Sequence, residues 1–149
     1  MSNKQPVLNY YELSSDVTAF STTRHGGVSD GNYASLNINE YCGDSKDNTD
    51  TNRQLLATEL DIDANRIIMP HQTHGVETRI IGKEFLSLPK SVKKMLLEGV
   101  DAVMTDIQGI CIGVSTADCI PVLLYDEEHH AAAAIHAGWR GTLARIVHK

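Results

Sequence analysis

Four short apolar runs follow one another closely in the last third of the chain, and they constrain its fold more than any other feature. Each is rich in aliphatic residues, which is typical of β-strands. The runs are Val100–Thr105, Ile110–Ser115, Val122–Tyr125 and Ala131–His136. A sheet built from them needs other elements to cover it, and 149 residues are enough to bury such a core.

The earlier part of the chain adds shorter strand patterns and amphipathic helices. We expect strands at Val7–Glu12, Val17–Thr23, Arg66–Met69 and Val76–Ile81, and helices at Asp47–Leu60, at Pro89–Glu98 and from Trp139 onward. Strand runs mixed with a few helices predict an α+β fold, a mixed α/β layered sandwich in which helices flank the sheet. The chain ends soon after its last expected helix begins. We therefore expect a single domain over residues 1–149, either a small domain with a short terminal helix or, as we favour, the N-terminal fragment of a longer one.

Composition and charge narrow the class of partner. The net charge of −6 argues against a nucleic-acid or anionic-membrane surface, although a small anionic substrate needs only a few local arginines. No run approaches the roughly 20 apolar residues of a membrane span, and the start has no apolar signal core, so a cytoplasmic protein is expected. Three cysteines in such a chain are expected to be thiols or ligands rather than disulfides.

Two segments concentrate the reactive side chains. STADCIP (115–121) contains Cys119, and IHAGWRG (135–141) contains His136. With a histidine of the upstream HQTHG (71–75), they supply two imidazoles and one thiolate, the ligand set of a zinc ion with an open coordination position. Within HQTHG we favour His74 as the ligand, with His71 as its competitor. The pattern predicts a catalytic metal site.

A metal-free reading of the same residues stays open. Cys119 and His136 together could form a nucleophile and its base. Asp118 is a candidate for the carboxylate that orients a histidine in either chemistry. Cys111, inside the apolar run ICIGV, is more simply a buried small hydrophobic residue.

Glycines and arginines mark possible anion contacts. Gly138 and Gly141 flank Arg140 where a helix is expected to begin, and free N–H groups with a guanidinium suit phosphate. Arg24 opens a glycine-rich loop whose backbone could approach a ligand closely, and Arg53 lies on the expected helix 47–60. An isolated arginine is more often a surface salt-bridge partner, so these assignments rest on the neighbouring residues.

The motifs together resemble a known family. They are TTRHGGVS (22–29), SLNI (35–38), NR (52–53), QTHG (72–75), DAVMT (101–105), STADCIPVLLYD (115–126) and AAIHAGWRGT (133–142). In this order they are similar to the YfiH-type purine nucleoside phosphorylases, also known as laccase-domain or polyphenol-oxidase proteins.

The resemblance implies a site, a cofactor and substrates. It implies zinc held by His74, Cys119 and His136, and phosphorolysis of adenosine, inosine, guanosine and methylthioadenosine, together with deamination of adenosine. Asn37, in SLNI, joins the substrate-binding candidates through the same resemblance. The implied fold is a mixed-sheet α/β sandwich related to a cysteine-hydrolase toxin fold. None of the seven histidines forms the H-x-H pairs of a multicopper cluster. A single copper in the His2Cys site is chemically conceivable and ranks below zinc.

Three functional hypotheses follow. The first is a zinc-dependent enzyme acting on purine nucleosides, with zinc activating phosphate or water. The second is a metal-free cysteine hydrolase or amidase that uses Cys119 and His136, with Asp118 orienting the histidine. The third is a non-catalytic binding module in which the metal serves stability alone.

Overall fold

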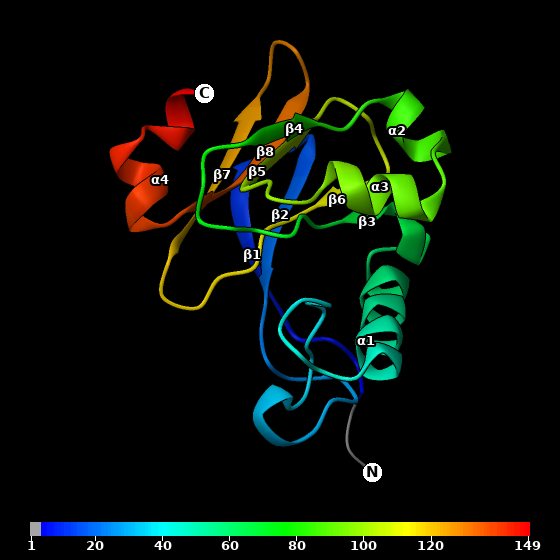
Figure 1. Ribbon diagram of the computed structural model, residues 1–149. Helices are drawn as coiled ribbons and strands as arrows, with labels where there is room; N and C mark the ends of the chain where they lie inside the picture. Colours follow the sequence, from blue (N-terminus) through cyan, green and yellow to red (C-terminus); the bar gives the residue numbers. More distant parts are fainter. Residues whose placement is uncertain (1–3) are drawn as a thin grey trace. The chain divides into compact units, whose positions relative to one another are not determined.

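The structure is a computed structural model that describes residues 4–149. By its internal contacts the chain divides into two compact units, Met1–Ile67 and Ile68–Lys149, and each is described separately. Figure 1 shows the first unit in blue to cyan and the second in green to red. None of the helices in the described part of the chain has the length and apolar character needed to cross a membrane.

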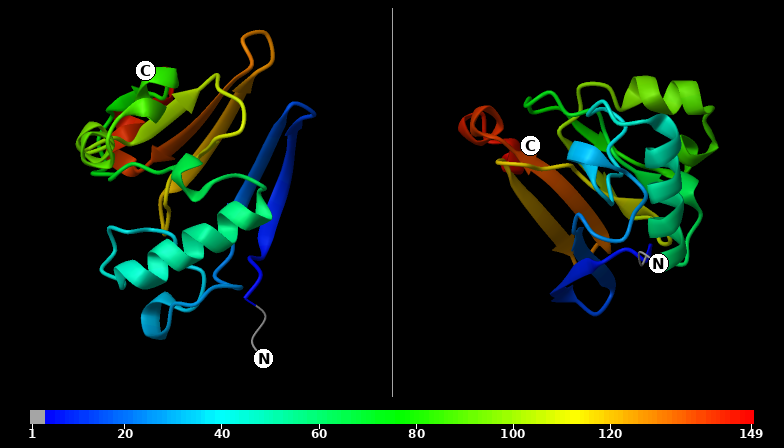
Figure 2. Two further views of the ribbon diagram at one scale, coloured as in Figure 1. Left: turned by 90° about the vertical axis from the view of Figure 1, so that its right-hand side faces the viewer. Right: turned by 90° about the horizontal axis from the view of Figure 1, so that it is seen from below.

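The first unit contains a β-hairpin and one long helix (Figure 2). Strands β1 (Leu8–Ser14) and β2 (Val17–Thr22) pair antiparallel, and α1 spans Lys46–Glu59. Leu56 and Ala57 of α1 are fully buried. The strand pair and the helix expected from the sequence are thus both present. Short 3-10 turns at Gly31–Tyr33 and Ala64–Arg66 complete the unit.

A buried asparagine organises the glycine-rich loop of this unit. Asn52 Nδ2 donates to Ser29 Oγ at 2.9 Å and to Asn37 O at 2.8 Å, and Asn52 Oδ1 accepts the N–H of Val28 at 2.8 Å. A Cβ on Gly27 would lie 2.6 Å from Asn52 Oδ1 and 2.2 Å from Ser35 O. Gly27 therefore serves close packing within the chain, whereas the sequence pattern favoured an approach to a ligand.

The second unit is built on a four-stranded mixed sheet with the order β4-β5-β8-β7. Its strands are β4 (Thr78–Ile80), β5 (Ala102–Thr105), β7 (Ile120–Asp126) and β8 (Ala131–Ala137). β4 and β5 run parallel and the other pairs antiparallel. The short strands β3 (Ile67–Ile68) and β6 (Cys111–Ile112) form a separate ladder. This mixed sheet with helices confirms the predicted α+β class.

Helices cover the sheet of the second unit, and the central strands bury side chains on both faces. The helices are α2 (Lys83–Ser87), α3 (Lys90–Leu96), α4 (Trp139–Leu143) and a 3-10 turn at Ile146–His148. Val103 of β5 packs with Phe85 of α2, whereas its neighbour Ala102 packs with Ile146. This is the alternation that successive residues of a strand impose. The sequence predicted α3 and the start of α4 but missed α2, whose five residues are too few to show helical periodicity.

Candidate metal centre

Three side chains from distant parts of the second unit meet at one place. The ligand atoms of His74, Cys119 and His136 all lie within 4.8 Å of one another. The two imidazole rings have centroids 4.8 Å apart and stand nearly perpendicular, at 78°. His74 comes from the loop before β4, Cys119 immediately precedes β7, and His136 lies near the end of β8. The structure therefore brings together the three residues expected to bind metal.

Strand register explains why Cys119 and His136 come together. In the β7–β8 ladder Pro121 lies opposite His136 and Ile120 opposite Ala137. One residue further along the same register, Cys119 faces Gly138. Because side chains alternate along a strand, residues 136 and 138 point to the same face, where the cysteine also lies.

Gly138 leaves the space that the three side chains occupy. A Cβ built at this position would lie 3.1 Å from Cys119 Sγ, 3.3 Å from His74 Cδ2 and 3.8 Å from His136 Cε1. Its φ of −71° is open to any residue, so the glycine is required by space rather than by backbone conformation. The sequence pointed to Gly138 as an anion contact, and the structure adds this steric role.

A buried carboxylate lies behind the histidines. Asp101 is 0% exposed and His136 is 3% exposed, and His136 Nδ1 lies 2.8 Å from Asp101 Oδ1. The β5–β8 register places Ala102 opposite Ile135, so Asp101 lies directly across from His136. With Nδ1 engaged by the carboxylate, Nε2 is the imidazole nitrogen that remains for a metal.

The same carboxylate holds the loop that carries His74. Asp101 Oδ1 accepts the backbone N–H of His74 at 2.9 Å, and Oδ2 accepts those of Gly75 at 2.8 Å and Thr73 at 3.2 Å. His74 has a φ of 62°, a left-handed conformation that side chains rarely adopt. These hydrogen bonds stabilise the turn that points His74 into the site.

The hydrogen bonds that Asp101 accepts favour the charged form of its carboxyl group. Burial raises its pKa, but the hydrogen bonds from His136 and from the N–H groups of Gly75, Thr73 and His74 together outweigh burial and lower the pKa below its usual value. A buried negative charge therefore lies directly against His136, where it favours a proton on Nδ1.

A side-chain amide links the histidine loop to the cysteine segment. Gln72 Nε2 donates to Ser115 O, and Gln72 Oε1 accepts the N–H of Ser115, both at 2.7 Å. Ser115 begins the STADC stretch that ends in Cys119. Gln72 therefore ties the segment carrying one ligand to the segment carrying another.

The structure distinguishes between sequence candidates at two positions of this site. His71, the competitor of His74, turns its Nδ1 to Glu98 Oε1 at 2.8 Å and takes no part in the group. Asp118 is exposed, and the carboxylate that contacts His136 is Asp101. Reasoning from single motifs favoured Asp118 because it adjoins Cys119 in the sequence, whereas pairing across strands selects the acid.

The sequence carries one signal for Asp101. An aspartate begins the apolar strand run DAVMT, and a charged residue in such a run must find partners when it is buried. Gln72 carried no comparable signal.

The anion-binding candidates are divided between the two units. In the second unit Arg140 is exposed and its guanidinium lies 5.3 Å from the ring of Trp139. Gly141 packs closely, since a Cβ there would lie 3.1 Å from Gly75 O. Arg140 and Gly141 come two and three residues after Gly138 along the chain.

In the first unit, the three candidate side chains bond to their own unit. Arg24 Nε donates to Ala34 O at 2.8 Å, and Arg53 Nη2 donates to Ile67 O at 2.5 Å. Asn37 Nδ2 donates to Asp44 Oδ2 at 2.9 Å. Arg24, Arg53 and Asn37 therefore stabilise local structure, and their contact with substrate stays a prediction.

The donor set fits a thiolate- and imidazole-binding metal. Zinc binds histidine nitrogen at about 2.0–2.1 Å and cysteine sulfur at about 2.3 Å, in a tetrahedral arrangement. Three donors within 4.8 Å of one another could share one ion after small side-chain movements. Glycine at position 138 keeps open the space where the three side chains meet. The carboxylate on the outer nitrogen of His136 is a common feature of metal sites.

Comparison with known proteins agrees with the motifs. A family model described as "Multi-copper polyphenol oxidoreductase laccase" matches residues 18–149. The chain belongs to this laccase-domain family. The family description refers to copper, whereas the metal that this group would hold is identified by neither the match nor the geometry.

Curated relatives of this laccase-domain chain carry the names of nucleoside enzymes. A purine nucleoside phosphorylase of Bacteroides thetaiotaomicron is 46% identical over 143 residues, which cover 95% of this chain and 53% of the relative. An adenosine deaminase from an unknown prokaryotic organism is 42% identical, with 93% and 53% covered. The chain thus spans about half the length of the curated relatives it matches.

Solved structures share the fold. The crystal structure of YlmD from Geobacillus stearothermophilus matches with a TM-score of 0.80 and 32% identity, covering 89% of this chain and 49% of that one. The YfiH protein of Bacillus licheniformis matches with a TM-score of 0.85 and 28% identity, with 95% and 53% covered.

Proposed function

We propose that this chain is the metal-binding part of a zinc-dependent purine nucleoside phosphorylase that also deaminates adenosine. The observation that carries the proposal is the meeting of His74, Cys119 and His136. Relatives named for these two activities supply the substrate class, namely purine nucleosides and phosphate. Zinc is preferred over copper because three protein ligands with an open position are typical of catalytic zinc.

Some of these residues would bind the ion and others the substrate. His74 and His136 would each offer one ring nitrogen and Cys119 its thiolate, while Asp101 keeps Nε2 of His136 available. A zinc ion bound there supplies a Lewis acid that also lowers the pKa of bound water. Arg140, close to Gly138 in the chain, would contribute a bidentate contact to phosphate.

The decisive experiment combines metal content with turnover. Protein purified without added metal is analysed by elemental mass spectrometry, and release of base from adenosine and inosine is measured with and without phosphate. We expect near-stoichiometric zinc, lost in His74→Ala, Cys119→Ala and His136→Ala, with turnover falling in parallel. Full turnover in all three variants would refute the proposal. Zinc that raises the melting temperature without any turnover would favour the binding-module hypothesis.

One observation favours a second candidate, a metal-free cysteine hydrolase. Cys119 and His136 lie in the same group, and Asp101 contacts the outer nitrogen of that histidine. Cys119 would be the nucleophile, His136 the base and Asp101 the acid that orients the base. This chemistry predicts activity that survives chelation and is lost on alkylation of Cys119. Activity abolished by a chelator and restored by zinc would exclude it.

A further inference from the structure

We infer that Asp101 is the positioning residue that pre-forms the metal centre, by selecting the ring tautomer of His136 and by holding the His74 loop in its left-handed turn. The inference rests on the proposed metal site. Its subject, however, is the arrangement of the chain before any metal binds. Asp101 touches neither the substrate nor the reacting atoms in this scheme and acts through the two histidines.

The selection of tautomer follows from the hydrogen-bond inventory. Both oxygens of Asp101 already accept backbone N–H groups, so the carboxyl acts as an acceptor and His136 Nδ1, at 2.8 Å from Oδ1, is the donor. In the neutral ring the lone pair is then on Nε2, which is the form that binds a metal. A ring with the opposite tautomer would present an N–H to the ion instead.

The second histidine depends on the same two oxygen atoms. Asp101 Oδ1 is shared between His136 Nδ1 and the N–H of His74, while Oδ2 receives the N–H groups of Thr73 and Gly75. The buried Asp101 side chain thus accepts four hydrogen bonds, and these connect His74 with His136, which are 62 residues apart in the chain. Removing the acceptor character of either oxygen would therefore disturb one ligand or the other.

Asp101→Asn tests this with almost no change of shape. The amide replaces one acceptor oxygen by an NH2 group. If this group faces His136, the ring escapes a donor–donor contact by moving its proton to Nε2, and the ligand nitrogen is blocked. If it faces Thr73 and Gly75, the turn that carries His74 loses both of those hydrogen bonds. Zinc binding is weakened in both cases.

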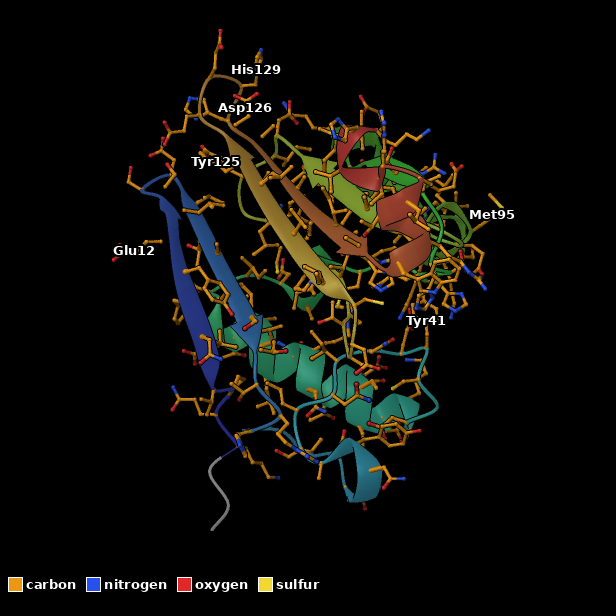
Figure 3. The ribbon with its side chains drawn as sticks, turned by 90° about the vertical axis from the view of Figure 1, so that its left-hand side faces the viewer. Glu12, Tyr41, Met95, Tyr125, Asp126 and His129 are labelled. Carbon is orange, nitrogen blue, oxygen red and sulfur yellow. The ribbon has the colours of Figure 1, made fainter. Side chains whose placement is uncertain are left out.

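The chain contains a matched control at the tip of the β7–β8 hairpin. Asp126 Oδ1 accepts the N–H groups of Glu128 and His129, and Oδ2 lies 2.8 Å from His129 Nδ1. Figure 3 shows Asp126 and His129 together at this exposed turn. Asp126→Asn makes the same chemical change to a carboxylate that accepts hydrogen bonds from backbone N–H groups and contacts an imidazole. Asp126 and His129, however, do not belong to the proposed metal site.

The experiment has two measurements on the 149-residue chain. The tautomer of His136 is read in metal-free wild-type protein from the ¹⁵N shifts of its ring nitrogens. Zinc affinity is measured by competition with a chromophoric chelator for wild type, Asp101→Asn and Asp126→Asn. We expect the Nδ1–H tautomer in wild type, about a 10–100-fold loss of zinc affinity in Asp101→Asn, and wild-type affinity in Asp126→Asn.

Each result decides one question. An Nε2–H tautomer in wild type, or wild-type zinc affinity in Asp101→Asn, would overturn the positioning role. The tautomer measurement needs no variant, so it decides the matter even if Asp101→Asn does not fold. A wild-type chain that holds the Nδ1–H tautomer yet binds no zinc would overturn the proposed function and support the positioning role.

Discussion

Adding one methyl group at Gly138 should push the proposed metal ligands apart without unfolding the chain. The Cβ of Gly138→Ala would meet Cys119 Sγ at 3.1 Å and His74 Cδ2 at 3.3 Å, whereas ordinary contact begins at 3.4 Å. Either the sulfur or the segment that carries the new methyl group must therefore give way by about 0.3 Å, and both movements change the space in which the ligand atoms meet. Since the φ of −71° suits alanine, the backbone is not strained.

The expected result is a zinc affinity lower by about 10–100-fold, the usual cost of disturbing the support of a ligand. The assay is chelator competition, with thermal unfolding of the metal-free protein as a check on the fold. Gly113→Ala is the matched control, because its Cβ would meet only Met69 Cγ at 3.9 Å. Wild-type zinc affinity in Gly138→Ala would refute the steric argument and with it the placement of an ion beside this glycine.

Three further predictions concern the supporting residues. Gln72→Ala removes two hydrogen bonds to Ser115 and should lower the free energy of unfolding by about 1–3 kcal/mol; an unchanged denaturant midpoint would count against it. Arg140→Ala should raise the KM for phosphate and leave zinc content unchanged; a loss of zinc instead would contradict its proposed role. Hydrogen bonds from Ser29 and Asn37 lower the pKa of Asp44. The ionised Asp44 carboxylate therefore stabilises the folded state fully above its unfolded pKa of about 3.9, and this stabilisation declines as pH falls through the lower folded pKa. The stability difference between wild type and Asp44→Asn should therefore shrink on acidification below about pH 4, and a constant difference would refute this account.

Local patterns in the sequence were sufficient for most of the fold. The β1–β2 hairpin, α1, β5 and β8 follow from alternation, helical spacing and turn residues, which depend on neighbours a few positions apart. The α2 helix was missed because five residues carry too little periodicity. Boundaries of short strands differed for the same reason: the run Ile110–Ser115 forms a strand only at Cys111–Ile112.

The sequence by itself determined which side chains could bind a metal, because cysteine and histidine are few and lie in distinctive motifs. It left open whether His71 or His74 belongs to the group, and it pointed to Asp118 as the orienting acid. Only the tertiary structure decided these points: the β5–β8 register sets Asp101 across from His136, and His74, in a left-handed turn, joins Cys119 and His136. Hydrogen bonds between residues far apart in the chain depend on the register of strands that do not follow one another, and a single motif does not show which residues that register sets opposite each other.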